Sequence, residues 1–225
     1  MSERSIYDKF RAAGMSHEGA CGLMGNLKAE SSMKANIAQR GMTTLSDAEY
    51  TRLADGGKST RAINGVAKYF YNDQIGYGLA QWTFWSRKQA LSEFAKSRGV
   101  SVGDETMQTD FIIHELRSDF TDLFSFLCQT RDLYAAADRV CREYERPAVN
   151  NVDRRYEFAQ EFDGKFGEEE AEDKSASSGA WYPPDLSILV LQAVLVGNGY
   201  NTEITGYKNA DFLKKLREFV TDIGA

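Results

Sequence analysis

GMSHEGACGLMGNLKAESS, residues 14–32, indicates most clearly what kind of fold this chain adopts. Ser16 is placed to cap a helix over 17–31, and apolar residues follow at three- and four-residue spacing on one face. Glu30 falls on the same face, about 20° around the helix from Leu23 at about 100° per residue. The helix therefore directs a carboxylate to a position where its pattern otherwise places an apolar side chain.

Helical spacing recurs along most of the chain and predicts a mostly α fold. Leu133, Ala136, Val140 and Tyr144, for example, mark one side of a single helix. Residues 57–75, with glycine, asparagine and aromatic residues, are the least helical part and are expected to form an irregular loop with a short hairpin. The predicted helices cover about 4–13, 17–31, 47–54, 86–98, 105–117, 119–129, 132–145 and 151–164.

The composition changes toward the C-terminus and predicts two domains. Residues 167–180, GEEEAEDKSASSGA, combine a run of acids with small polar residues, which is typical of a solvated linker. Residues 1–166 then form the main domain, and residues 181–225 form a small helical module with a last helix over about 209–222. A piece of that size buries little surface when it folds alone.

The bulk composition argues against several classes of function. A net charge of -6 and a pI near 5.1 leave no basic stripe for nucleic-acid phosphates. The three cysteines lie in helical patterns, so we expect reduced, buried thiols and not a disulfide framework. No signal peptide and no apolar run of about 18 residues is present, so we expect synthesis in a cytosol and no membrane insertion.

The position of Glu30 favours acid catalysis. Partial removal from water and the unpaired carbonyls at a helix C-terminus both disfavour the anion, so we expect the pKa of Glu30 to be raised. Glycoside cleavage needs such an acid, because the leaving sugar oxygen takes up a proton as its bond breaks. A glutamate at the rim of the helix with no catalytic role fits the periodicity equally well.

YGLAQWT, residues 77–83, is the second informative stretch. Glycines flank Tyr77 and allow close approach of the backbone, while Gln81, Trp82 and Trp85 are suited to hydrogen bonding and stacking on sugar rings. Taken alone, a glycine–aromatic turn that leads into a helix is more often structural.

Taken in order, GLMGNLKAESS and GYGLAQWT, with Arg87 a helical turn later, resemble the phage tail lysozyme and endolysin family of the lysozyme superfamily. The Glu-Ser pair followed by Gly-Leu-x-Gln is also similar to goose-type lysozymes and lytic transglycosylases. The likeness continues through HEL, 114–116, and YERP with Arg155, so that it covers roughly residues 12–165.

The resemblance implies an α-helical, lysozyme-like domain with a substrate cleft, which acts on bacterial peptidoglycan. Glu30 would protonate the glycosidic oxygen between N-acetylmuramic acid and N-acetylglucosamine, with Ser31 orienting its carboxylate. Tyr77, Gln81 and Trp82 would line the cleft. No cofactor or metal is expected.

A hydrolase of the usual kind needs a second carboxylate, about 5–5.5 Å from the acid as a nucleophile or about 6.5–9.5 Å away as a base. Asp73, in the loop before YGLAQW, is our choice for this role, and Asp47 and Asp55 are alternatives that are more often turn or cap residues. Without a second carboxylate, the muramyl hydroxyl attacks instead. The protein is then a lytic transglycosylase that releases 1,6-anhydro sugar.

Two other functional classes fit parts of the sequence. His17 and Cys21 lie one helical turn apart and pair as base and nucleophile in a peptidase hypothesis, although no third orienting group is evident. A phage structural or wall-binding protein with the lysozyme fold but no activity is the non-enzymatic alternative.

The C-terminal piece, residues 181–225, is similar to small three-helix peptidoglycan-binding domains, with a helical cap or an oligomerisation piece as the alternative. The missing signal peptide fits an endolysin that stays in the host cytoplasm until a holin opens the membrane. It fits an enzyme carried in the virion tail equally well.

Overall fold

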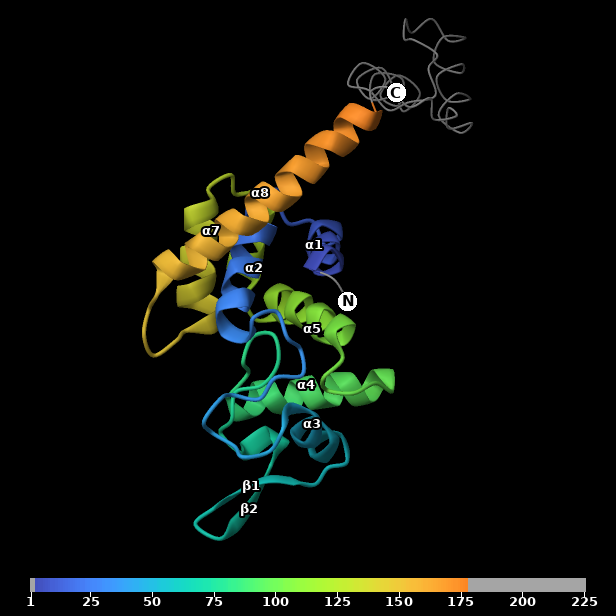
Figure 1. Ribbon diagram of the computed structural model, residues 1–225, viewed down its shortest axis with the longest axis vertical. Coiled ribbons are helices and arrows are strands. Elements are labelled where there is room, and N and C mark those ends of the chain that lie inside the picture. The colour runs from blue at the N-terminus through green and yellow to red at the C-terminus, as the bar shows by residue number, and fades with distance from the viewer. Residues whose placement is uncertain (1–2, 178–225) are drawn as a thin grey trace, which may run out of the picture. The chain divides into compact units, whose positions relative to one another are not determined.

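The computed structural model describes residues 3–177 and confirms the mostly α fold (Figure 1). The α-helices are α1 (Glu3–Ala12), α2 (His17–Ser31), α3 (Asp47–Asp55), α4 (Trp85–Arg98), α5 (Glu105–Ser118), α6 (Thr121–Gln129), α7 (Leu133–Arg139) and α8 (Val152–Ser177). The other elements are strands β1 (Ser59–Ile63) and β2 (Val66–Tyr69), the 3-10 turn η1 (Phe70–Asn72) and the π-helical turn η2 (Val140–Glu145).

Local capping signals account for the helix starts. The Ser16 hydroxyl accepts a hydrogen bond from the Gly19 amide at the start of α2, and Ser46 does the same for Glu49 at the start of α3. The predicted loop over 57–75 contains the antiparallel β1–β2 hairpin and η1.

Two predicted elements differ from the structure. The single helix predicted over 132–145 is α7 followed by the π-helical turn η2, in which each turn holds an extra residue. The last predicted helix, 151–164, continues as α8 to Ser177, so the described part of the predicted linker is helical.

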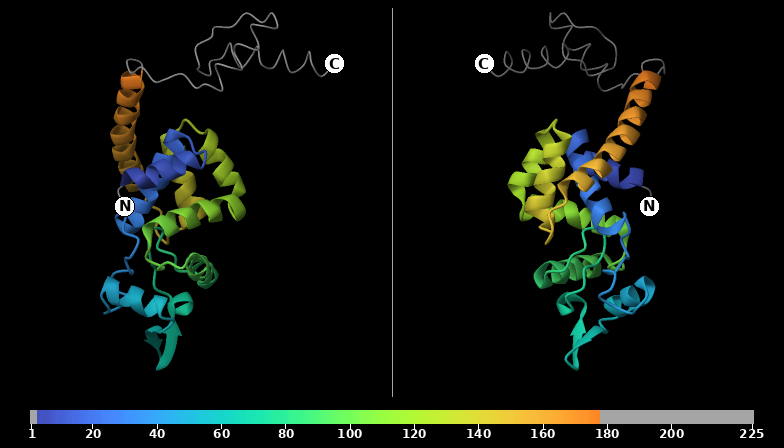
Figure 2. Two further views of the ribbon diagram at one scale, coloured as in Figure 1. Left: turned by 90° about the vertical axis from the view of Figure 1, so that its right-hand side faces the viewer. Right: turned by 60° about the vertical axis from the view of Figure 1, so that its left-hand side comes forward.

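Residues 3–169 have two parts. The helices α1, α2, α6 and α7 pack on one another at one end, while α3, the hairpin and η1 lie at the other, with α4 packed against η1 (Figures 1 and 2). α5 contacts α1 and α6 on one side and α4 on the other, so it connects the two parts.

Close packing around α2 depends on its glycines. A Cβ atom on Gly22 would lie 2.5 Å from the Ala136 Cβ atom of α7. A Cβ atom on Gly25 would lie 2.5 Å from the Arg155 carbonyl oxygen and 2.7 Å from the Ala159 amide nitrogen of α8. Because glycine has no side chain, α7 and α8 approach the α2 backbone directly, and the first turn of α8 lies beside the end of α2 that carries Glu30.

The chain divides into two units, Met1–Glu169 and Glu170–Ala225. The predicted C-terminal module, 181–225, and its helix over about 209–222 lie outside the described residues, so the domain assignment remains a prediction. No helix within residues 3–177 has the length and the apolar composition that crossing a membrane requires.

Candidate active site

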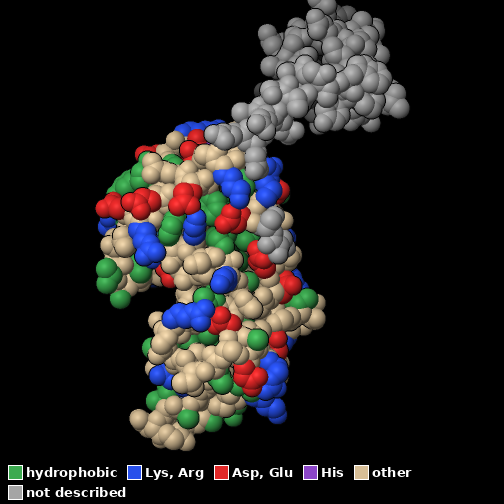
Figure 3. All heavy atoms as spheres, viewed as in Figure 1, with side chains coloured by type: hydrophobic (Ala, Val, Ile, Leu, Met, Phe, Trp, Pro, Cys, Tyr) green, Lys and Arg blue, Asp and Glu red, His purple; other side chains and the backbone are tan. Residues whose placement is uncertain are grey.

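A cleft of about 900 Å³ lies between the two parts of the first unit. In the space-filling view it corresponds to the hollow on the left-hand side of the described surface (Figure 3). Its walls come from the end of α2, the end of η2 with the residues that follow it, the loop 37–40, and the turn 80–84. Arg87 of α4 and Phe120 complete the lining, so the cleft collects side chains from segments that are far apart in the sequence.

Glu30 lies in this cleft, in the last turn of α2, as the helical pattern predicts. Its side chain is 20% exposed, and its Oε1 accepts a hydrogen bond of 2.5 Å from Nη2 of the buried Arg155. Arg155 is oriented by a second bond, from Nη1 to the Asn26 side-chain oxygen at 3.1 Å. The Glu30 carboxylate is therefore held in place by a buried guanidinium that is itself fixed to α2.

Glu145 is a second carboxylate in the same cleft. It is the last residue of η2 and belongs to the YERP motif. Its Oε1 is shielded from solvent and has no hydrogen-bond partner among the described residues. Burial raises the pKa of Glu145 well above its usual range, and the charge of Glu30 raises it further, although Arg87 and Arg155 act in the opposite direction. In the free protein Glu145 therefore retains a proton to higher pH than an ordinary glutamate.

Glu115, from α5, links side chains beneath the cleft through hydrogen bonds. Its carboxylate accepts hydrogen bonds from Arg87 Nε at 2.7 Å and Nη2 at 2.9 Å, from Trp82 Nε1 at 2.9 Å and from the Tyr144 hydroxyl at 2.7 Å. The Arg87 guanidinium also lies over the Tyr144 ring, 4.5 Å from its centroid. Four donors to one buried carboxylate indicate a structural group.

The carboxyl groups in and beneath the cleft differ in whether they have an arginine partner. Arg87 pairs with Glu115 and Arg155 pairs with Glu30, which leaves Glu145 without an arginine partner of its own among the described residues. Arg40 and Arg146 also line the cleft, but they contact Asp47 and the Glu143 carbonyl, so Glu145 is the group for which burial of an unpaired charge favours a retained proton.

The YGLAQW segment forms a tight turn whose ends pair across the chain. The Tyr77 amide donates to the Trp82 carbonyl at 3.2 Å, and the Trp82 amide donates to the Tyr77 carbonyl at 3.0 Å. Gln81 has a left-handed backbone with φ of 45°, lines the cleft, and donates its side-chain amide to the Gly78 and Ile37 carbonyls. Trp82 also lines the cleft but is 1% exposed, so at most an edge of its ring is available.

Three predicted site residues lie elsewhere. Tyr77 is fully buried with its hydroxyl on Thr51, and Ser31 is buried with its hydroxyl donated to the Leu27 carbonyl. Neither lines the cleft, so Tyr77 supports the turn and Ser31 supports the end of α2. Trp85 is 55% exposed and lines a neighbouring hollow.

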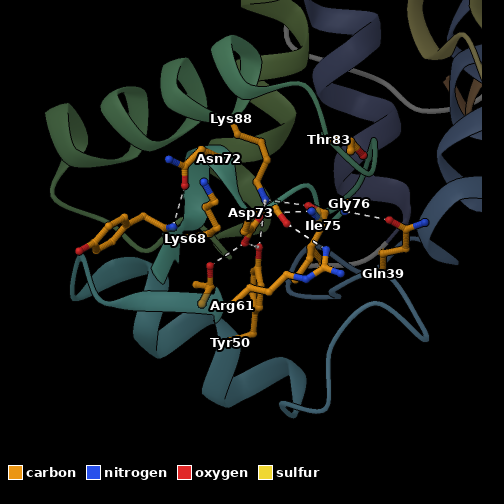
Figure 4. Close-up of polar contacts among 12 residues, drawn as sticks. Gln39, Tyr50, Arg61, Lys68, Asn72, Asp73, Ile75, Gly76, Thr83 and Lys88 are labelled. Carbon is orange, nitrogen blue, oxygen red and sulfur yellow. Dashed lines mark hydrogen bonds and ion pairs between the residues drawn. The ribbon is translucent and has the colours of Figure 1, made fainter. Parts of the chain in front are cut away.

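The structure contradicts the prediction that Asp73 faces the cleft. Asp73 is fully buried and accepts hydrogen bonds of 2.6 Å each from the Lys88 ammonium, the Tyr50 hydroxyl and the Thr60 hydroxyl (Figure 4). Burial lowers the pKa of Lys88 to about 8, although the contact with Asp73 acts in the opposite direction. Such a buried pair is a structural feature of the hairpin part.

The peptidase pairing is also contradicted. Cys21 is fully buried, its sulfur lies 3.9 Å from His17 Nε2, and the same nitrogen lies 3.0 Å from Asp163. A substrate cannot reach a nucleophile in that position. Within residues 3–177, no group of three or more His, Cys, Asp or Glu side chains is placed to hold a metal ion.

The sequence contains signals for the cleft residues that our prediction does not name. Glu145 stands four residues after Cys141 and shares the buried face of the same helical pattern. Glu115 is the central residue of the HEL motif and lies four residues after Phe111, on the buried face of its helix. In both cases a carboxylate on a buried face marks the site, as it does for Glu30.

The family model for phage tail lysozyme matches residues 2–166. The chain belongs to the phage tail lysozyme family. The match includes every residue that lines the cleft, and it confirms the resemblance inferred from the two motifs. Membership makes the chain a lysozyme-like enzyme of phage origin that breaks down peptidoglycan. No curated protein matches the sequence.

Proposed function

We propose that this lysozyme cleaves the β-1,4 bond between N-acetylmuramic acid and N-acetylglucosamine, with Glu30 as the general acid and Glu145 as the second carboxylate. The observation that carries the proposal is that both side chains line one cleft, where Glu145 has no arginine partner of its own among the described residues and its pKa is raised. A cleft that retains one acidic proton meets the first requirement of glycoside cleavage.

The charge of Glu30 raises the pKa of Glu145, so the two carboxyl groups interact across the cleft, and in the proposed cycle they exchange one proton. When Glu30 holds it, the proton passes to the glycosidic oxygen as the bond to the anomeric carbon breaks. The ionised pair then stabilises the positive charge that develops on the sugar. A water molecule attacks the anomeric carbon and gives its proton to Glu145, which is the group that holds the proton in the free protein.

The contact between Arg155 and Glu30 favours the reverse assignment, in which Glu145 donates the proton and Glu30 acts as the base. Leaving-group dependence separates the two assignments. An aryl glycoside with a good leaving group needs no proton from the enzyme, so loss of the acid affects it little, whereas loss of the base affects every substrate.

The experiment compares Glu30→Gln and Glu145→Gln on purified peptidoglycan and on a dinitrophenyl glycoside of an N-acetylglucosamine oligomer. We expect Glu30→Gln to lose turnover on peptidoglycan by about 10²-fold or more but to keep turnover on the aryl glycoside. Glu145→Gln should lose both. The opposite pattern assigns the acid to Glu145, and equal clearing by the wild type and Glu30→Gln removes Glu30 from the mechanism.

The presence of Glu145 supports hydrolysis over the transglycosylase alternative, because a second carboxylate can activate water. Mass spectrometry of the digested wall distinguishes the two reactions. A reducing muramic acid end is expected, and a product lighter by one water would identify transglycosylation. Absence of clearing by the wild type would favour the non-enzymatic wall-binding alternative.

We propose further that the protein acts from within the host as an endolysin, with the virion tail as the alternative. The family match supports a phage protein that acts on the cell wall. Mass spectrometry of purified virions tests this: finding the chain in intact particles would assign it to the tail.

A further inference from the structure

A second hollow of about 580 Å³ lies next to the cleft. We name it the aromatic hollow, and its lining consists of Tyr71, Asn72, Gln74, Thr83, Phe84 and Trp85. Phe84 is 63% exposed, Trp85 is 55% exposed and Tyr71 is 42% exposed. Three large aromatic side chains so open to water around one hollow are unusual for a surface without a ligand.

The aromatic hollow and the cleft are adjacent and share part of their lining. Thr83 and Phe84 line both of them. Phe84 is the N-cap residue of α4 but makes no side-chain capping bond, so its ring is not needed to start the helix. A polymer that lies in the cleft beside Gln81 therefore meets the aromatic hollow as it continues.

The lining of the hollow suits a neutral sugar. Phe84 and Trp85 have ring centroids 6.2 Å apart at an interplanar angle of 43°, so they present two differently inclined faces. Aromatic faces bind the C–H surfaces of sugar rings, and the Gln74 amide lines the same hollow and can bind hydroxyl and N-acetyl groups. The Asn72 side-chain oxygen accepts the Tyr69 amide, so Asn72 offers only its NH2 group. No charged side chain lines the hollow, which argues against the charged peptide stems as its ligand.

The buried pair Asp73–Lys88 holds the two walls of the hollow together. Asp73 directly follows η1, which carries Tyr71 and Asn72, and Lys88 is three residues after Trp85 on α4. In Figure 4, Asp73 lies between two donors: Lys88 contacts it from one side and Tyr50 contacts it from the opposite side. Walls fixed by a buried ion pair are preorganised, which reduces the entropy lost on binding.

We propose that the aromatic hollow is a distal subsite that binds the glycan strand beyond the bond to be cleaved. This inference rests on the proposed glycosidase function, because the occupant is the continuing strand of the same substrate. Its consequence is that long strands bind more tightly than short ones, and the difference depends on Trp85 and Phe84.

Binding is measured in the Glu30→Gln background, so that it does not depend on turnover, with a ladder of N-acetylglucosamine oligomers and calorimetry as the readout. We expect Trp85→Ala to weaken the longest oligomers about tenfold and to leave the shortest unchanged. Trp85→Phe should restore most of the affinity. Tyr134→Ala, which removes an aromatic side chain of 45% exposure from α7, is the matched control and should have no effect.

Each outcome decides the proposal. Equal binding of long oligomers by the Trp85→Ala and Tyr134→Ala proteins would overturn it. A loss of affinity that is the same for oligomers of every length would also overturn it, since the hollow would then not be a separate subsite. Length-dependent binding without any clearing of cell walls by the wild type would keep the subsite and reject the catalytic proposal. Thermal denaturation of each variant excludes unfolding as the cause.

Discussion

Glu145 combines burial, a neighbouring negative charge and an oxygen without a hydrogen-bond partner, and this combination makes stability depend on pH. An unfolded glutamate loses its proton near pH 4.3, approximately, whereas the folded Glu145 keeps its proton to higher pH. The folded state therefore binds more protons above that pH, and the free energy of unfolding falls as pH rises toward the folded pKa. Glutamine has no proton to lose.

We therefore expect Glu145→Gln to be more stable than the wild type at neutral pH, with a difference that disappears near pH 4, approximately. Urea denaturation at a series of pH values measures this. The control is Glu157→Gln, at an exposed glutamate of α8 that lies outside the cleft. Parallel stability curves for the wild type and Glu145→Gln would contradict the raised pKa.

The role of Asp73 is structural, because it is the counter-charge of a buried lysine. Replacing it with asparagine leaves the Lys88 ammonium buried without its counter-charge, and breaking a buried pair costs about 3–5 kcal/mol. We expect Asp73→Asn to lose stability of that order in urea denaturation, while the folded fraction keeps its turnover on short oligomers. Asp119→Asn, at the end of α5, is the control. Unchanged stability with lost turnover would return Asp73 to the mechanism.

At the scale of elements, the sequence predicts those helices whose ends are set by local interactions. The capping serines Ser16 and Ser46 and the three- and four-residue spacing locate α2 and α3 to within a residue. The π-helical turn and the extension of α8 to Ser177 are not predictable in this way. An extra residue in one turn depends on how α7 packs against α2, and that is a tertiary effect.

The first turn of α8 packs directly on the backbone of α2 at a glycine. A Cβ atom on Gly25 collides with backbone atoms of Arg155 and Ala159, so Gly25→Ala must push the first turn of α8 outward. We expect a loss of about 1–3 kcal/mol and reduced turnover, because Arg155 then leaves its position beside Glu30. Gly164→Ala on α8 is the matched control, since its Cβ atom meets nothing within 4 Å. Equal stability of both variants would contradict close packing at Gly25.

At the scale of the whole molecule, the sequence predicts the lysozyme-like fold and Glu30 but not the pairing of charges across the cleft. Glu30, Glu115 and Glu145 come from three elements, and no local spacing relates them. The place of Asp73 in the loop favours it as the second carboxylate when only the sequence is considered. Its partner, the buried Lys88, comes from the following helix, and a sequence pattern does not show that contact.

The two units of the chain are expected to have separate roles, catalysis and attachment to the cell wall. The residues that line the cleft and the aromatic hollow all belong to the unit Met1–Glu169, so we expect the chemistry not to need residues 181–225. If the C-terminal module binds the wall, it raises the local concentration of the enzyme at an insoluble substrate and adds nothing for a soluble one. Removing 181–225 should therefore leave turnover of soluble oligomers within about twofold and slow the clearing of whole cell walls by tenfold, approximately, or more. Turbidity and oligomer assays on the same preparation measure both, and an equal loss in the two assays would instead make the module a part of the catalytic unit.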